Sequence, residues 1–89
     1  MTQITLEIVN VKGLHARASA KLVEVVEGFD AQAEVSKDGM NASGDSIMGL
    51  LMLAAAKGSF IDVETSGADA EALAAALTTL VADKFGEGM

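Results

Sequence analysis

Residues 2–29 read TQITLEIVNVKGLHARASAKLVEVVEGF and contain two hydrophobic periods in succession. Apolar and polar residues alternate over Thr2–Val11, which is the period-2 pattern of a strand that buries one face. After Gly13 the apolar positions recur at helical spacing over Ala16–Phe29, with charged residues between them. The chain is therefore expected to begin with a strand and a helix, and Gly28 is expected to end that helix.

A β-hairpin is expected next, at the dipeptide Asp38-Gly39. These two residue types tolerate the positive φ angles that a two-residue hairpin turn requires. Alternation around residues 33–36 and a short extended segment near Met40–Ala42 supply the two strands of this hairpin.

The second half of the chain predicts two further helices and one strand. Ser46 is a residue type that caps helix N-termini, and it precedes the apolar stretch Ile47–Leu53, which predicts a short helix. Phe60–Thr65 alternates again, as a fourth strand would. Asp69, a second capping type, is expected to start a long alanine-rich helix.

The predicted order of elements is βαββαβα, which places the chain in the α+β class. Such an order favours an open-faced β-sandwich, with a four-stranded antiparallel sheet and three helices on one face. The alternating strands agree with this arrangement, because each keeps one polar face for solvent. At 89 residues, one domain spanning residues 1–89 is expected.

The composition excludes several classes of chemistry. The chain has no cysteine and one histidine, so a thiolate metal site, a paired-histidine metal site and a thiol nucleophile are not expected. A net charge of -7 argues against nucleic-acid binding, which relies on Lys and Arg to neutralise phosphates. The longest apolar run, Ile47–Ala56, is far shorter than the roughly 20 residues that span a bilayer. We expect a cytoplasmic protein without membrane insertion.

The basic residues are concentrated around the single histidine. Lys12, Arg17 and Lys21 are half of the basic residues, and the window that they span contains His15 and no acid. Such a group of cations can be a solvated helix face and nothing more. The histidine among them favours a functional interpretation.

Residues 13–17, Gly-Leu-His-Ala-Arg, lie where the first strand passes into the first helix. The first amides of a helix have no intrahelical partner and favour a bound anion, so Ala16 and Arg17 would offer N–H groups to a phosphate. His15 can act as a nucleophile, and the Arg17 guanidinium can hold phosphate oxygens. From the residues alone a helix-capping histidine and a contact for a partner protein remain alternatives.

The sequence also resembles a known family. Residues 13–20, Gly-Leu-His-Ala-Arg-Ala-Ser-Ala, are similar to the active-site motif of HPr, the histidine-containing phosphocarrier of the bacterial phosphoenolpyruvate-dependent phosphotransferase system. Residues 45–53 and the helix start at residues 67–71 are similar to further segments of that family. The resemblance covers essentially the whole chain, including the order of elements.

The resemblance implies a phosphocarrier without small-molecule turnover of its own. His15 would accept a phosphoryl group on Nδ1 from phospho-enzyme I and pass it to an enzyme IIA component. Arg17 would position this group, and the amides of Ala16 and Arg17 would bind its oxygens. No cofactor is implied, and a monomer is expected.

A regulatory site and a partner surface are implied as well. Ser46 matches the position that a serine kinase and phosphatase modify in some bacterial groups, and a phosphate at a helix N-terminus is physically tolerated. The short helix carries more apolar residues than one side can bury, so part of it should be exposed to partners. The expected interface residues are Lys12, Lys21, Ile47, Met48, Leu51 and Met52.

Two positions depart from the usual family pattern. Ala18 stands where many members have proline, and Asp45 stands where lysine is common. With these departures the sequence resembles the branch of the family in which the phosphorelay regulates nitrogen or carbon metabolism instead of driving sugar uptake. The alternative from another class is a regulatory binding module that acts only through Ser46 and the 47–52 surface, without use of His15.

Overall fold

The structure, a computed structural model, describes residues 1–87 and confirms the predicted βαββαβα order. A short 3₁₀ turn, η1, follows the last helix. The elements are β1 (Thr2–Glu7), α1 (Ala16–Glu27), β2 (Gln32–Lys37), β3 (Met40–Ser43), α2 (Ile47–Met52), β4 (Phe60–Ser66), α3 (Ala70–Ala82) and η1 (Lys84–Gly86).

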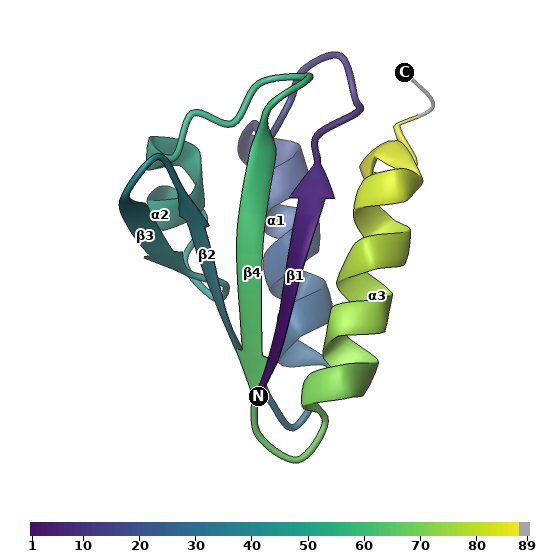
Figure 1. Cartoon of the computed structure of the whole chain (residues 1–89). Coiled ribbons are helices and arrows are strands. Elements are labelled where there is room, and N and C mark those ends of the chain that lie inside the picture. The colour runs from purple at the N-terminus through teal and green to yellow at the C-terminus, as the bar shows by residue number, and fades with distance from the viewer. Residues whose placement is uncertain (88–89) are drawn as a thin grey trace.

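The four strands form one antiparallel sheet in the order β1-β4-β2-β3. Figure 1 shows α1, α2 and α3 on one face of this sheet, while the other face carries no helix among residues 1–87. The predicted open-faced sandwich is therefore confirmed. Both edges of the sheet are formed by strands from the first half of the chain, because β4 inserts between β1 and β2.

The predicted faces of the strands are confirmed by burial. Leu6 and Ile8 are buried, and Ile61 and Val63 face the same core from β4. The core lies between the sheet and the helices, which contribute Leu22, Leu50 and Leu77 among others. Because one face of each strand packs on this core, the period-2 pattern also fixes the register of the sheet.

The structure confirms the turns and helix ends that short sequence patterns predicted. Asp38 and Gly39 adopt φ angles of 52° and 82° in the β2–β3 hairpin. Ser46 caps α2, since its Oγ accepts a hydrogen bond from the N–H of Gly49 at 3.0 Å. Gly28 caps the end of α1.

One boundary prediction needs correction. The first strand ends at Glu7 rather than at Val11, because after Ile8 the chain leaves β4 and forms the loop that leads to α1. The predicted start of the last helix is confirmed, since Asp69 occupies the N-cap position of α3, although its carboxylate makes no hydrogen bond to that helix. It accepts instead from the N–H of Asp30 at 2.8 Å, so it joins the α1–β2 loop to the start of α3.

In Figure 1 the β1–α1 loop, the loop between α2 and β4 and the turn that follows α3 all lie at the top of the molecule. Backbone hydrogen bonds hold the first two loops together. Ile8 pairs with Gly58 and Ser59, and the N–H of Leu14 donates to the carbonyl of Ala55 at 2.8 Å. This end of the fold therefore brings together three segments that are distant in sequence.

Candidate functional site

His15 lies at this end, at the N-terminus of α1. It is the N-cap residue, with φ -78° and ψ -176°, and its side chain is 26% exposed. The carbonyl of His15 accepts the first helical hydrogen bond, from the N–H of Ser19 at 2.8 Å. The imidazole therefore stands beside the first amides of α1, where the helix dipole is positive.

Gly13 sets the position of this histidine. It has a φ of +67°, and a Cβ built on it would lie 2.4 Å from the carbonyl oxygen of Ala55 and 3.0 Å from the Cα of Ala56. Only glycine permits both this backbone conformation and such a close approach of two chains. The loop before α1 is thus packed directly against the segment that follows α2.

The hydrogen bonds of the ring define its tautomer. The N–H of Arg17 donates to Nδ1 of His15 at 3.3 Å, so Nδ1 carries a lone pair and no proton. Nε2 contacts the carboxylate of Glu87, which is an acceptor, and a neutral ring therefore carries its proton on Nε2. The nitrogen that can act as a nucleophile is the one that faces the N-terminus of the helix.

Glu87 is a site residue that the sequence analysis did not identify. Its side chain is 10% exposed and lies between the histidine and Asn10. The amide Nδ2 of Asn10 donates to Glu87 Oε1 at 2.9 Å and to the carbonyl of Gly13 at 2.8 Å. The hydrogen bond from Asn10 lowers the pKa of Glu87 below its usual value. Burial opposes this shift, whereas the hydrogen bond to His15 and the charges of His15 and Lys12 also lower the pKa.

Sequence periodicity carries no signal for this contact, since Glu87 is 72 positions away from His15. Asn10 offered a weak signal. An amide side chain just after an apolar strand is a candidate for a buried hydrogen-bonding role, and Asn10 is fully buried.

Two hollows lie at this site, and His15 lines one of them. One is lined by Leu14, His15, Leu51 and the chain at residues 54–56, and the other by Val11, Arg17, Gly86 and Glu87. Lys12 borders both of them. Lys12, Ala16 and Arg17 are exposed residues, so the two predicted cations lie at the surface close to the ring.

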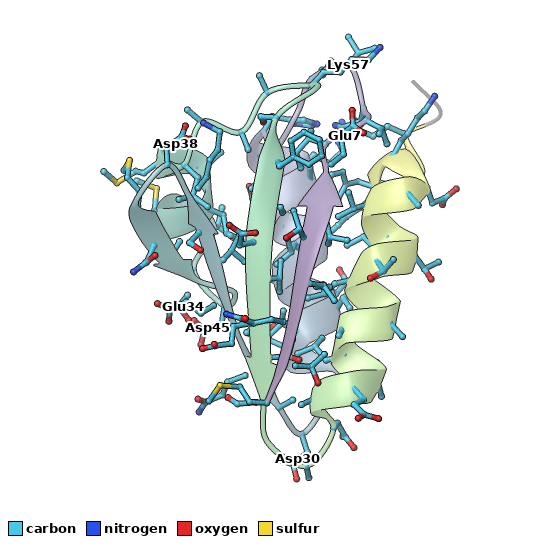
Figure 2. All side chains as sticks on the ribbon, viewed as in Figure 1. Glu7, Asp30, Glu34, Asp38, Asp45 and Lys57 are labelled. Atoms are coloured by element: carbon cyan, nitrogen blue, oxygen red, sulfur yellow. The ribbon has the colours of Figure 1, made fainter. Side chains whose placement is uncertain are left out.

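The other predicted cation, Lys21, lies one turn further along α1 and is partly buried. Its Nζ donates to the carbonyl of Phe85 at 2.8 Å. This ammonium group therefore ties α1 to the η1 turn. Lys57 belongs to the loop between α2 and β4, and Figure 2 shows it at the same end of the molecule as Glu7.

The predicted exposure of α2 is found in the structure. Ile47, Met48 and Met52 are 40%, 70% and 66% exposed, whereas Leu50 is buried in the core. Leu51 is partly buried and lines the hollow beside His15. The apolar surface of α2 thus continues up to the edge of the histidine site.

Asp45 and Ser46 lie at the start of α2. Asp45 accepts from the hydroxyl of Ser43 at 2.6 Å and lines a hollow with Glu34 and Glu64. Figure 2 shows Asp45 close to Glu34 and distant from Lys57, at the other end of the sheet. The aspartate that departs from the usual family pattern is therefore away from His15.

Within residues 1–87, no helix has the length and apolar character needed to cross a membrane. In the same described part of the chain, no three His, Asp or Glu side chains come together as a metal site would require.

Comparisons with known proteins agree on one family. Residues 2–83 match the family model described as "PTS HPr component phosphorylation site". The phosphocarrier protein HPr of Neisseria meningitidis serogroup A is 48% identical over 88 residues, which are 99% of each chain. The phosphocarrier protein NPr of Escherichia coli K12 is 43% identical over 84 residues, or 93% of each chain.

Solved structures show the same fold. HPr-C-His from Thermoanaerobacter tengcongensis matches with a TM-score of 0.94 and 37% identity, and the match covers 100% of both chains. HPr from Bacillus anthracis matches with a TM-score of 0.85 and 36% identity, over 90% of this chain and 95% of that one.

Proposed function

Because this chain belongs to the HPr family of phosphocarriers of the phosphotransferase system, we propose that His15 is its phosphoryl acceptor. In this proposal phospho-enzyme I is the donor and an enzyme IIA component is the next acceptor. The observation that carries the proposal is the state of the ring: Nδ1 holds a lone pair and faces the first amides of α1.

The transfer needs little chemistry from this chain. The lone pair on Nδ1 forms a bond to phosphorus, while the bond between phosphorus and the donor breaks and its electron pair returns to the donor. Positioning and charge stabilisation supply most of the catalysis in phosphoryl transfer. The amides of Ala16 and Arg17 would bind the phosphoryl oxygens, and the exposed Arg17 guanidinium would offset their charge.

The place of Nδ1 suits a carrier better than an enzyme with a substrate of its own. The ring is partly exposed and lines one of the two hollows, so two partner proteins can approach the same nitrogen in turn. A partly exposed site would also leave the phosphoryl group weakly held and ready for transfer. We propose that the protein works in this way in the cytoplasm, as a monomer of one domain.

The partner surface is proposed to combine cations with the apolar face of α2. Lys12 borders both hollows, and Leu51 joins the histidine site to the exposed side chains of α2. Apolar contacts would supply affinity, while the cations guide the approach of acidic partners. The proposed set is Lys12, Lys21, Ile47, Met48, Leu51 and Met52, in which Lys21 contributes mainly through the turn that it holds in place.

Ser46 is proposed as a second, regulatory phosphorylation site for a serine kinase. Its hydroxyl caps α2 next to Ile47 and Met48, so a phosphate there would add negative charge to the partner surface. A helix N-terminus tolerates such a group. Treatment with a serine kinase that acts on HPr proteins should label the wild type and leave Ser46→Ala unlabelled.

The relatives include both HPr and NPr proteins, and the role can lie in sugar uptake or in a nitrogen-type regulatory relay. Phosphorylated protein offered separately to a sugar-type and a nitrogen-type enzyme IIA should discharge faster to its own acceptor. The rates of the two transfers distinguish the roles.

The central test is phosphorylation by enzyme I and phosphoenolpyruvate. We expect an adduct that is stable in base and labile in acid, and since the chain has one histidine, the adduct must disappear in His15→Ala. Arg17→Ala should slow its formation, whereas Lys57→Ala, which also removes an exposed cation, should have a smaller effect. An undiminished adduct in His15→Ala would refute the proposal and favour a binding module that acts through α2.

A further inference from the structure

The C-terminal turn places a carboxylate against the histidine. Phe85 is fully buried in the core, and its carbonyl accepts from Lys21 Nζ at 2.8 Å. Lys84 and Phe85 both have positive φ angles, 56° and 55°, which non-glycine residues adopt only when their surroundings enforce it. The anchored Phe85 and the cation on α1 are such surroundings, and they bring Glu87 to the N-terminus of α1.

Asn10 then orients the carboxylate. Its amide is fully buried and donates to the Gly13 carbonyl as well as to Glu87 Oε1, so it cannot rotate without losing a bond. With Oε1 held in this way, Oε2 faces Nε2 of His15. A buried amide, a carboxylate and an imidazole thus form one chain of hydrogen bonds that starts at the backbone of Gly13.

We infer that Glu87 is a positioning residue for His15, which keeps the ring proton on Nε2 and offsets the positive charge that the ring acquires when Nδ1 binds phosphorus. This inference rests on the proposed function of His15. A carboxylate has the same two effects on a histidine base in hydrolases, where it holds the tautomer and stabilises the imidazolium without taking the proton.

The atoms balance without any proton transfer to solvent. When the bond between Nδ1 and phosphorus forms, the neutral ring becomes cationic, and its Nε2 proton stays hydrogen-bonded to Glu87. When the phosphoryl group leaves for the next acceptor, the electron pair of the broken bond returns to Nδ1 and the ring becomes neutral again. The carboxylate therefore favours acceptance of the phosphoryl group. It also keeps the proton on Nε2, and a ring with this proton is the better leaving group.

The charges around the carboxylate agree with this role. Lys12 and Arg17 border the same hollow as Glu87, so the carboxylate is not left as an isolated negative charge beside a phosphoryl group. Nδ1 and Nε2 lie on different sides of the ring, and the Arg17 amide and Glu87 are accordingly bound to different nitrogens. The ring has one polar partner for the reacting atom and another for the proton.

The experiment compares the wild type with Glu87→Gln, which keeps the shape of the side chain and removes its charge. Glu34→Gln is the matched control, since Glu34 is an exposed carboxylate on β2. Figure 2 shows it far from Lys57, which belongs to the loop at the histidine end of the molecule. The first measurement is the ¹⁵N shift of both ring nitrogens in the unphosphorylated proteins at a pH where the ring is neutral. We expect the Nε2–H tautomer in the wild type and the control, and a mixture of tautomers in Glu87→Gln.

The second measurement is the rate of phosphorylation by enzyme I and the rate of discharge to an enzyme IIA. Both rates should fall about tenfold in Glu87→Gln, the effect of a modest charge-assisted hydrogen bond, and stay unchanged in Glu34→Gln. Wild-type tautomers together with wild-type rates in Glu87→Gln would overturn the inference. A faster acceptance in Glu87→Gln would also overturn it, because it would show that the carboxylate acts by repelling the phosphoryl group.

The outcomes separate this inference from the proposed function. If the wild type forms no phosphohistidine, the proposed function fails, while the ring shifts still report whether Glu87 fixes the tautomer. If the wild type is phosphorylated and Glu87→Gln behaves like Glu34→Gln in both measurements, only the role of Glu87 fails.

Discussion

Replacement of Gly13 by alanine should destabilise the fold and displace the histidine. Two effects add at this position. A residue with a Cβ pays about 1 to 2 kcal/mol for the left-handed conformation at φ +67°. The new Cβ would also lie 2.4 Å from the carbonyl oxygen of Ala55, a backbone atom that cannot move alone.

Relief of this clash requires the loop before α1 to move away from the segment after α2. The hydrogen bond from the N–H of Leu14 to the Ala55 carbonyl joins the same two segments at 2.8 Å and would be lost, at a cost of about 1 kcal/mol. With the conformational term, Gly13→Ala should lower the free energy of unfolding by about 2 to 3 kcal/mol. For a domain of this size that corresponds to a fall in Tm of about 15 °C.

Gly39→Ala is the matched control. Gly39 also has a positive φ, +82°, but a Cβ added there meets no atom within 4 Å. It should therefore cost about 1 to 2 kcal/mol, the conformational term alone. Urea unfolding followed by circular dichroism measures both variants, and the difference between them isolates the steric contribution at Gly13.

The phosphorylation assay gives the functional half of this prediction. Because the displaced loop carries His15 at its end, Gly13→Ala should accept the phosphoryl group more slowly at a temperature where it is still folded, while Gly39→Ala should match the wild type. Equal destabilisation of the two variants would refute the reasoning, since it would show that the approach to Ala55 imposes no constraint.

Three further predictions concern the cap, the carboxylate and the C-terminal anchor. Ser46→Ala should cost about 1 kcal/mol in urea unfolding and Ser46→Asn very little, because asparagine also caps; equal losses would contradict the role of the Oγ bond to α2. In the folded protein the pKa of Glu87 should lie below its usual value, so the ionised carboxylate stabilises the fold at neutral pH. This stabilisation is lost in acid as the pH falls through the lowered pKa. The midpoint of a ¹³C titration of its carboxyl should rise in Asn10→Ala, and an unchanged midpoint would show that the amide does not cause the pKa shift. Phe85→Ala should cost about 3 to 5 kcal/mol, since the ring is fully buried, whereas Phe60→Ala, at a ring 59% exposed, should cost less than about 0.5 kcal/mol.

The elements of this fold were predictable because their signals are local. Alternation in the strands, helical spacing after Gly13 and the dipeptide Asp38-Gly39 each act over a few residues, and the structure confirms them. The cap at Ser46 is local in the same sense, since its hydrogen bond spans three residues. Asp69 stands at the start of α3 as predicted, but its carboxylate accepts from the N–H of Asp30, a distant partner that no local pattern indicates.

The same distinction between local and distant contacts applies to the candidate site. The sequence was sufficient to propose His15 and Arg17, because a nucleophile and a phosphate-binding group at the start of one helix are neighbours in the chain. Glu87 and Asn10 could not be found in this way, since they meet the histidine only after Phe85 enters the core and the C-terminal turn closes over α1. Contacts between distant segments depend on how all the helices pack on one sheet, and no short pattern of residues records that packing.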